Sequence, residues 1–129
     1  MPNGVVRVYP ASGAVAMLPL TPDNDYTPTV LFCGGSDMPE EYYGNYSWPF
    51  YNTWTYPSSI DCQRLTPEPQ DGSSPVYVQD DHMPEGRTMG QFITLPDGTM
   101  LVLNGAANGT SGFTNRTLNT PSVDQMPFG

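Results

Sequence analysis

Basic residues are scarce in this sequence. Four Lys and Arg stand against 13 Asp and Glu, which gives a formal net charge of −9 at pH 7. Binding to nucleic acid needs clustered Lys and Arg that neutralise phosphates, and attraction to anionic membrane surfaces needs the same side chains. The sequence therefore predicts neither nucleic acid nor a membrane as a partner.

Long apolar segments and helical patterns are also missing. No apolar run approaches the roughly 20 residues that a membrane-spanning helix needs. No stretch repeats apolar residues at helical spacing, and 15 Pro and 13 Gly interrupt most windows long enough for a helix. The 8 Tyr, 5 Phe and 2 Trp are too many for a disordered chain. These features predict an all-β protein with short strands and long ordered loops.

Cysteine and histidine are few, which argues against a zinc site. The chain has two Cys, no Cys-x-x-Cys and one His. A disulfide between Cys33 and Cys62 is the better interpretation. Three Asn-x-Ser/Thr motifs, at Asn45, Asn108 and Asn115, are glycosylation candidates and favour a secreted, extracellular protein. No charged segment leads into an apolar one at the start, so we expect the signal peptide to be missing from this segment.

Two pairs of apolar runs predict two β-hairpins. The first joins residues 12–20 to 29–35 through a polar turn, and the second joins 89–95 to 99–106 through Leu-Pro-Asp-Gly. The returning strands contain three or more successive apolar residues, which suggests burial on both faces. "VYVQD" at 76–80 is predicted as a short outer strand.

Residues 36–75 are predicted as a long loop between strands. This segment carries six Pro, five Tyr and both Trp, and its aromatic residues favour an ordered loop that lies over a surface. Two hairpins with outer strands amount to about two blades of a β-propeller. Propellers close with roughly four to eight blades, and each blade buries its faces against its neighbours. We therefore expect the chain to be a piece of a larger propeller.

Four segments carry a resemblance to a known family. They are "RVYPASGAVAMLPLTP", "YTPTVLFCGGSDM", "PEPQDGSSPVYVQDD" and "MPEGRTMGQFITLPDGTMLVLNGAANGTSGF". In this order they resemble the N-terminal catalytic region of fungal glyoxal oxidases, which belong with galactose oxidase to the copper radical oxidases. The resemblance identifies residues 1–129 as a partial glyoxal oxidase N-terminal domain.

The resemblance implies a secreted, kelch-type seven-bladed β-propeller with one copper ion. Members of the family oxidise simple aldehydes and α-hydroxycarbonyl compounds to carboxylic acids, reduce O2 to hydrogen peroxide, and supply that peroxide to peroxidases in lignin degradation. Two His and two Tyr hold the copper, and one Tyr, cross-linked to a Cys, serves as a radical. Imidazole and phenolate suit copper, and the radical supplies the second oxidising equivalent. The remaining blades of the same chain would be the structural partners of this segment.

The resemblance places the copper ligands and the Tyr-Cys cofactor outside this segment. In the family pattern the cross-linked Cys and Tyr precede "YPASGA", and the remaining ligands follow "NGAANGTSG". We therefore expect no catalytic residue and no metal ligand here. Two alternatives stay open: a non-catalytic kelch-like binding module, and a copper radical oxidase that acts on alcohols or sugars.

A few residues could nevertheless contribute to function. His82 is expected in an exposed loop, because a two-His site cannot be built from one His. Tyr42, Tyr43 and Trp48 could line the approach of substrate, although packing against a neighbouring blade explains them equally well. Arg87 is expected to make a buried ion pair or a hydrogen bond to a loop carbonyl.

Overall fold

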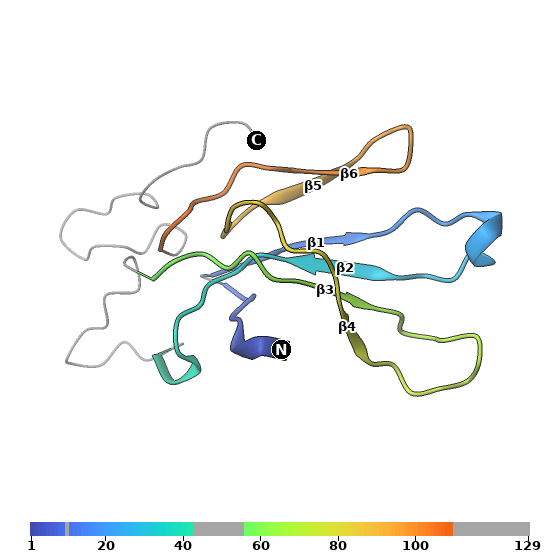
Figure 1. Cartoon of the computed structure of the whole chain (residues 1–129), viewed down its shortest axis with the longest axis horizontal. Coiled ribbons are helices and arrows are strands. Elements are labelled where there is room, and N and C mark those ends of the chain that lie inside the picture. The colour runs from blue at the N-terminus through green and yellow to red at the C-terminus, as the bar shows by residue number, and fades with distance from the viewer. Residues whose placement is uncertain (10, 43–55, 110–129) are drawn as a thin grey trace.

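A computed structural model describes residues 1–9, 11–42 and 56–109 of the chain (Figure 1). The six strands are β1 (Ala14–Met17), β2 (Val30–Cys33), β3 (Cys62–Leu65), β4 (Tyr77–Gln79), β5 (Gln91–Thr94) and β6 (Met100–Leu103). The only helical segments in these ranges are the 3-10 turns η1 (Pro2–Gly4), η2 (Pro22–Asn24) and η3 (Glu40–Tyr42). Within the described residues, no helix has the length and apolarity to cross a membrane. The expected all-β class is confirmed for this part of the chain.

The strands form two antiparallel sheets. Strands β1, β2, β3 and β4 follow one another in a four-stranded sheet, and β5 pairs with β6 in a two-stranded sheet. Both predicted hairpins are present: Ala14 lies opposite Cys33 in the first, and Gln91 lies opposite Leu103 in the second. The predicted outer strand is β4, at the edge of the larger sheet.

The segment 36–75 differs from the prediction, because it contains strand β3. Strand β3 pairs with β2 on one side and with β4 on the other. Its sequence, Cys-Gln-Arg-Leu, holds two strongly polar residues and gave no strand signal by itself. Strand β3 is stabilised by its pairing with the apolar β2 and by the disulfide to Cys33, because its own sequence has low strand propensity.

The main core lies between the two sheets. Leu31, Cys33, Cys62 and Met83 are buried there, and Phe92 and Val102 of the hairpin pack against them. Figure 1 shows the β5–β6 hairpin running beside β1. One face of the four-stranded sheet is therefore covered near β1 and β2.

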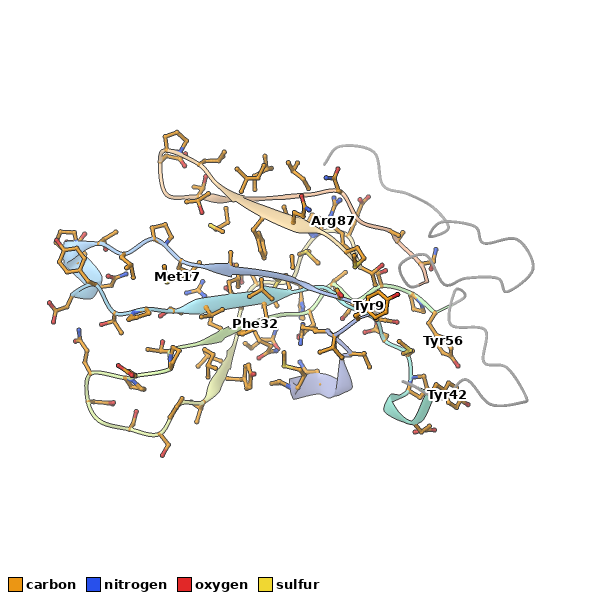
Figure 2. The ribbon with its side chains drawn as sticks, turned by 180° about the vertical axis from the view of Figure 1, so that it is seen from behind. Tyr9, Met17, Phe32, Tyr42, Tyr56 and Arg87 are labelled. Carbon is orange, nitrogen blue, oxygen red and sulfur yellow. A yellow bond between two sulfur atoms is a disulfide. The ribbon has the colours of Figure 1, made fainter. Side chains whose placement is uncertain are left out.

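The opposite face of this sheet is only partly covered. Side chains alternate between faces along a strand, so Val15 and Met17 lie on the face opposite the core, and they are 55% and 54% exposed. Phe32, on the same face, is half-buried, and Figure 2 shows it with Met17 on these strands. Burial of the returning strands on both faces was expected; β2 buries Leu31 and Cys33 on the core face, and its Val30 and Phe32 on the other face are half-buried among the described residues.

Five segments meet at one end of the sheets, which we call the loop end. Single β-bridges connect Val6 to Ser36 and Ser36 to Ser58, and further bridges connect Pro57 to Asn108 and Thr88 to Ala106. A smaller core of Val6, Ala11 and Met38, with Tyr56 packed against it, lies under these bridges. The loop end is therefore an ordered assembly of segments that are far apart in the sequence.

Candidate functional site

The loop end carries Tyr42, the one residue proposed for substrate approach that the structure describes. The rings of Tyr42 and Tyr56 lie 6.1 Å apart between centroids in a tilted arrangement, and Figure 2 shows both at this end. Both side chains are half-buried. Tyr43 and Trp48 lie outside the described residues. Tyr42 thus packs against another aromatic ring, and its role in substrate approach stays a prediction.

An ion pair of Arg7 and Asp61 lies buried near the loop end. The Nη2 atom of Arg7 is 2.5 Å from Oδ2 of Asp61 and also donates to the backbone oxygen of Asp61 at 3.0 Å. The aliphatic stem of Arg7 passes over Gly13 and Gly35, where a Cβ atom would lie within 3.2 Å of it. Two glycines therefore make room for a guanidinium that fixes the segment before β1 onto the start of β3.

The carboxylate of Asp61 also accepts hydrogen bonds from three amides. They come from Gln63, Gln79 and Asn3, at 2.9 to 3.1 Å. Burial raises the pKa of Asp61, but the hydrogen bonds from Arg7 and these amides outweigh it and lower the pKa to about 2. Asp61 is therefore ionised at any ordinary pH, and its charge is used to hold structure.

Arg87 is buried at the loop end and binds a loop carbonyl, as the sequence predicted. Its Nη1 atom donates to the backbone oxygen of Asn104 at 3.0 Å, and its own backbone oxygen accepts from the amide of Gly35 at 2.8 Å. Figure 2 shows Arg87 beside the hairpin. The residue connects the two sheets and does not reach into an open site.

The described residues do not offer a copper site. Cys33 and Cys62 form a disulfide that joins β2 to β3, so neither thiol is free for a cross-link to tyrosine. His82 is exposed, and within the described ranges no three His, Cys, Asp or Glu side chains come together as metal ligands would. The donor set that a His- and Tyr-bound copper requires is not assembled from these residues.

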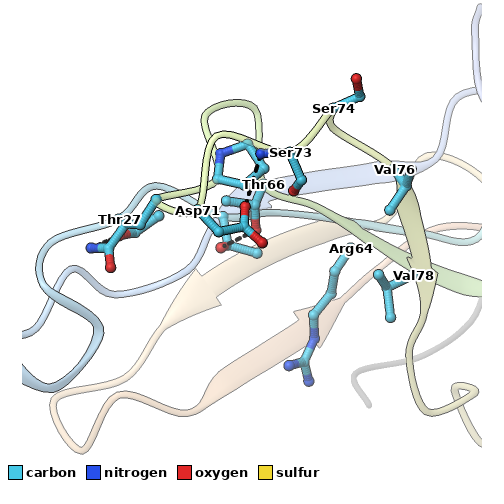
Figure 3. A pocket seen from close by; sticks show the side chains of 11 residues that line it. Thr27, Arg64, Thr66, Asp71, Ser73, Ser74, Val76 and Val78 are labelled. Carbon is cyan, nitrogen blue, oxygen red and sulfur yellow. Dashed lines mark hydrogen bonds between the residues drawn. The ribbon is translucent and has the colours of Figure 1, made fainter.

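A groove lies over β3 and β4 (Figure 3). It encloses about 590 Å³. Its lining is mostly hydroxyl, amide and charged side chains: Thr27, Thr29, Arg64, Thr66, Pro69, Gln70, Asp71, Ser73, Ser74, Val76 and Val78. The guanidinium of Arg64 is paired with Asp80 through two hydrogen bonds, at 2.5 and 2.8 Å.

Sequence reasoning missed both the Arg7–Asp61 pair and this groove. A signal for Arg7 was present, since a single cation stands between Val6 and Val8 in a chain with only four basic residues. The groove had no such signal, because it depends on two turns that meet only in the folded chain. Of the glycosylation candidates, Asn108 is half-buried, and Asn45 and Asn115 lie outside the described residues.

Comparison with known proteins places the chain in a family. A family model described as Glyoxal oxidase N-terminus matches residues 1–125. The chain belongs to the glyoxal oxidase family. This confirms the family expected from the four sequence segments and, with it, membership of an oxidase family.

Three relatives illustrate the similarity. "Putative aldehyde oxidase Art an 7" of Artemisia annua is 38% identical over 120 residues, which cover 91% of this chain and 19% of the relative. Aldehyde oxidase GLOX of Vitis pseudoreticulata is 33% identical over 112 residues, 86% of this chain and 19% of the relative. Aldehyde oxidase GLOX1 of Arabidopsis thaliana is 32% identical over 117 residues, 88% of this chain and 17% of the relative. This member of the glyoxal oxidase family thus spans about a fifth of the length of these relatives. They come from plants, and a fungal source stays a prediction.

Proposed function

We propose that this chain is a structural part of a secreted aldehyde oxidase. The complete protein would oxidise simple aldehydes and α-hydroxycarbonyl compounds to carboxylic acids and reduce O2 to hydrogen peroxide. The observation that carries the proposal is the glyoxal oxidase match over residues 1–125. The names of the relatives from Vitis and Arabidopsis, both aldehyde oxidases, support it.

The sheet topology supports a propeller. Four antiparallel strands in sequential order are the usual content of one blade, and β1 to β4 have this order. The β5–β6 hairpin, stacked on the same sheet, would be the beginning of the next blade. The uncovered Val15 and Met17 would then pack against a neighbouring blade from outside residues 1–129, since blades bury their faces against one another.

The copper and its Tyr-Cys radical would be held by residues of the complete protein that lie outside residues 1–129. Copper with a protein radical supplies the two-electron oxidation of the aldehyde when it is bound. The residues of this chain contribute support instead, because the Arg7–Asp61 pair, the Cys33–Cys62 disulfide and Arg87 hold the loop end in one arrangement. A rigid support of this kind is what a precisely placed reaction centre requires.

A peroxide assay on the complete protein tests this function. The product of the whole reading frame, loaded with copper, is expected to release hydrogen peroxide from methylglyoxal and glyoxal, whereas residues 1–129 with added copper release none. A panel that adds primary alcohols and galactose separates an aldehyde oxidase from an oxidase of alcohols or sugars. Absence of peroxide with every substrate would indicate a non-catalytic binding module. Peroxide from residues 1–129 alone would contradict the supporting role.

A further inference from the structure

We propose that Asn104 is a site of spontaneous deamidation and that Arg87 promotes the reaction. The chain contains three Asn-Gly pairs, which begin at Asn3, Asn104 and Asn108. Glycine has no Cβ atom, so the backbone nitrogen that follows the Asn can approach the Asn side chain with little hindrance. All three pairs therefore have the local sequence for deamidation, and the fold decides which of them reacts.

The reaction has two steps and needs only water as a co-reactant. First the backbone nitrogen of Gly105 loses its proton and attacks Cγ of Asn104. The bond from Cγ to Nδ2 breaks, and ammonia leaves with that proton, so that a succinimide ring remains. Water then opens the ring at one of its two carbonyl carbons. Opening at Cγ gives aspartate, and opening at the backbone carbonyl carbon gives isoaspartate.

Arg87 donates to the peptide group that joins the two reacting residues. Its Nη1 atom lies 3.0 Å from the backbone oxygen of Asn104, and its side chain is 7% exposed. When the nitrogen of Gly105 loses its proton, the negative charge is shared with the oxygen of Asn104, because the peptide group is conjugated. A buried guanidinium on this oxygen stabilises the charge as it develops. Arg87 therefore lowers the barrier of the first step.

The position of Arg87 also selects the product. Its ion-pair partner among the described residues is Glu85, whose Oε2 atom is 3.9 Å away and whose side chain is 64% exposed. Opening of the ring at the backbone carbonyl carbon turns the oxygen that Arg87 binds into part of a free α-carboxylate. A buried cation then exchanges a neutral acceptor for a charged one, which is a stronger hydrogen bond. We therefore expect isoaspartate as the main product.

The fold restrains the side chain of Asn3. Its Nδ2 atom donates to Oδ1 of Asp61 at 2.9 Å and to Oε1 of Gln79 at 3.0 Å. Attack on Cγ of Asn3 would have to break both hydrogen bonds, so this pair should react slowly.

The fold restrains the backbone at Asn108 but neither reacting group at Asn104. The amide of Gly109 donates to the backbone oxygen of Tyr56 at 2.9 Å, so the nitrogen that would attack Asn108 is occupied. For the side chain of Asn104 and the amide of Gly105, the structure gives no hydrogen bond to any described residue. Asn104 is therefore the pair at which attack breaks no such bond.

Peptide mapping of the complete protein tests the proposal. Folded protein, made without N-glycosylation so that Asn108 carries no glycan, is incubated at mildly alkaline pH, and mass spectrometry measures deamidation and isoaspartate at each pair. Asn104 is expected to react about tenfold faster than Asn3 and Asn108, because one charge-assisted hydrogen bond stabilises its developing charge. In urea the three rates should converge, and the share of isoaspartate at Asn104 should fall.

The variant Arg87→Met separates promotion from simple loosening of the structure. Loosening of the loop end alone would raise the rate at Asn104, whereas loss of the promoting hydrogen bond is expected to lower it about tenfold. Arg7→Met is the matched control, because Arg7 is equally buried and is bonded to Asp61. Arg7→Met should not slow the reaction at Asn104.

Three results would overturn the proposal. The first is a rate at Asn104 no higher than that at Asn3 in the folded protein, as when a segment outside the described residues holds the Asn104 side chain. The second is an unchanged or higher rate at Asn104 in Arg87→Met. The third is an equal share of isoaspartate in the folded protein and in urea, a comparison that needs no variant to fold. None of these results depends on peroxide production, so this inference can fail without the proposed oxidase function.

Discussion

Arg7 and Asp61 form an ion pair across 54 positions of sequence, and almost none of either side chain reaches solvent. The exposed fractions of the two side chains are 1% and 7%. The pair attaches the segment before β1 to the start of β3, where the disulfide also begins. The start of β3 is therefore held to two distant parts of the chain, by the charge pair to Arg7 and by the disulfide to Cys33.

Replacing Arg7 by Met is expected to destabilise the protein by about 3 to 5 kcal/mol, because the charge of Asp61 would stay buried without its partner. Arg64→Met is the control, since the side chain of Arg64 in its pair with Asp80 is 51% exposed. Exposed pairs contribute about 0 to 1 kcal/mol. Urea unfolding of the complete protein measures both. Similar losses in the two variants would contradict a special role for the buried pair.

The stability of this region should fall in acid because of Asp61. Its folded pKa of about 2 lies below the ordinary value of 3.8. The stabilisation is therefore complete above about pH 4 and is lost as the pH falls through 2, and its size is about 2 kcal/mol. Between about pH 4 and pH 2, the midpoint of unfolding should fall in the wild type and should fall less in Asp61→Asn. An equal acid sensitivity of both proteins would show that other carboxyl groups control it.

Removing the disulfide is expected to lower the free energy of unfolding by about 3 to 4 kcal/mol, because a closed loop reduces the entropy of the unfolded chain. The two cysteines are 29 positions apart. In Cys33→Ala with Cys62→Ala, unfolding should occur at lower urea and should no longer respond to a reducing agent. The wild type with reductant should approach the double variant. If reductant leaves the unfolding of the wild type unchanged, the reductant does not reach the buried disulfide or the disulfide does not stabilise the protein. Unfolding of the double variant at lower urea would indicate the first explanation, and unchanged unfolding would indicate the second.

The parts of the fold that the sequence predicted are those with a local pattern. The hairpin at residues 89–106 has two apolar runs joined by a Pro-Asp-Gly turn, and Gly98 adopts the positive φ that such a turn requires. Strand β3 has no such pattern, because its place depends on partners about 30 residues earlier and about 15 residues later. The Arg7–Asp61 pair and the groove depend on the same long-range contacts, so both became visible only in the folded chain.

Gly86 is expected to tolerate no side chain, because it lies directly against the backbone of Ser58 at the loop end. A Cβ atom at Gly86 would overlap the backbone oxygen and carbonyl carbon of Ser58, and Ser58 forms the β-bridge to Ser36. Both contacts are with backbone, so relief requires that two paired segments move apart. Gly86→Ala should therefore destabilise the protein by about 1 to 3 kcal/mol.

Gly90→Ala is the control for this substitution. The nearest atom to a Cβ at Gly90 is the backbone oxygen of Leu103 at 3.5 Å, an ordinary contact. Alanine there should leave stability unchanged or raise it slightly, since it restricts the unfolded chain. Hydrogen exchange of residues 56–61 in the complete protein measures the local effect, and it should rise in Gly86→Ala alone. Unchanged exchange there would mean that the loop end can separate from residues 83–90 without loss, and the rigid support proposed for the reaction centre would then have to come from another part of the protein.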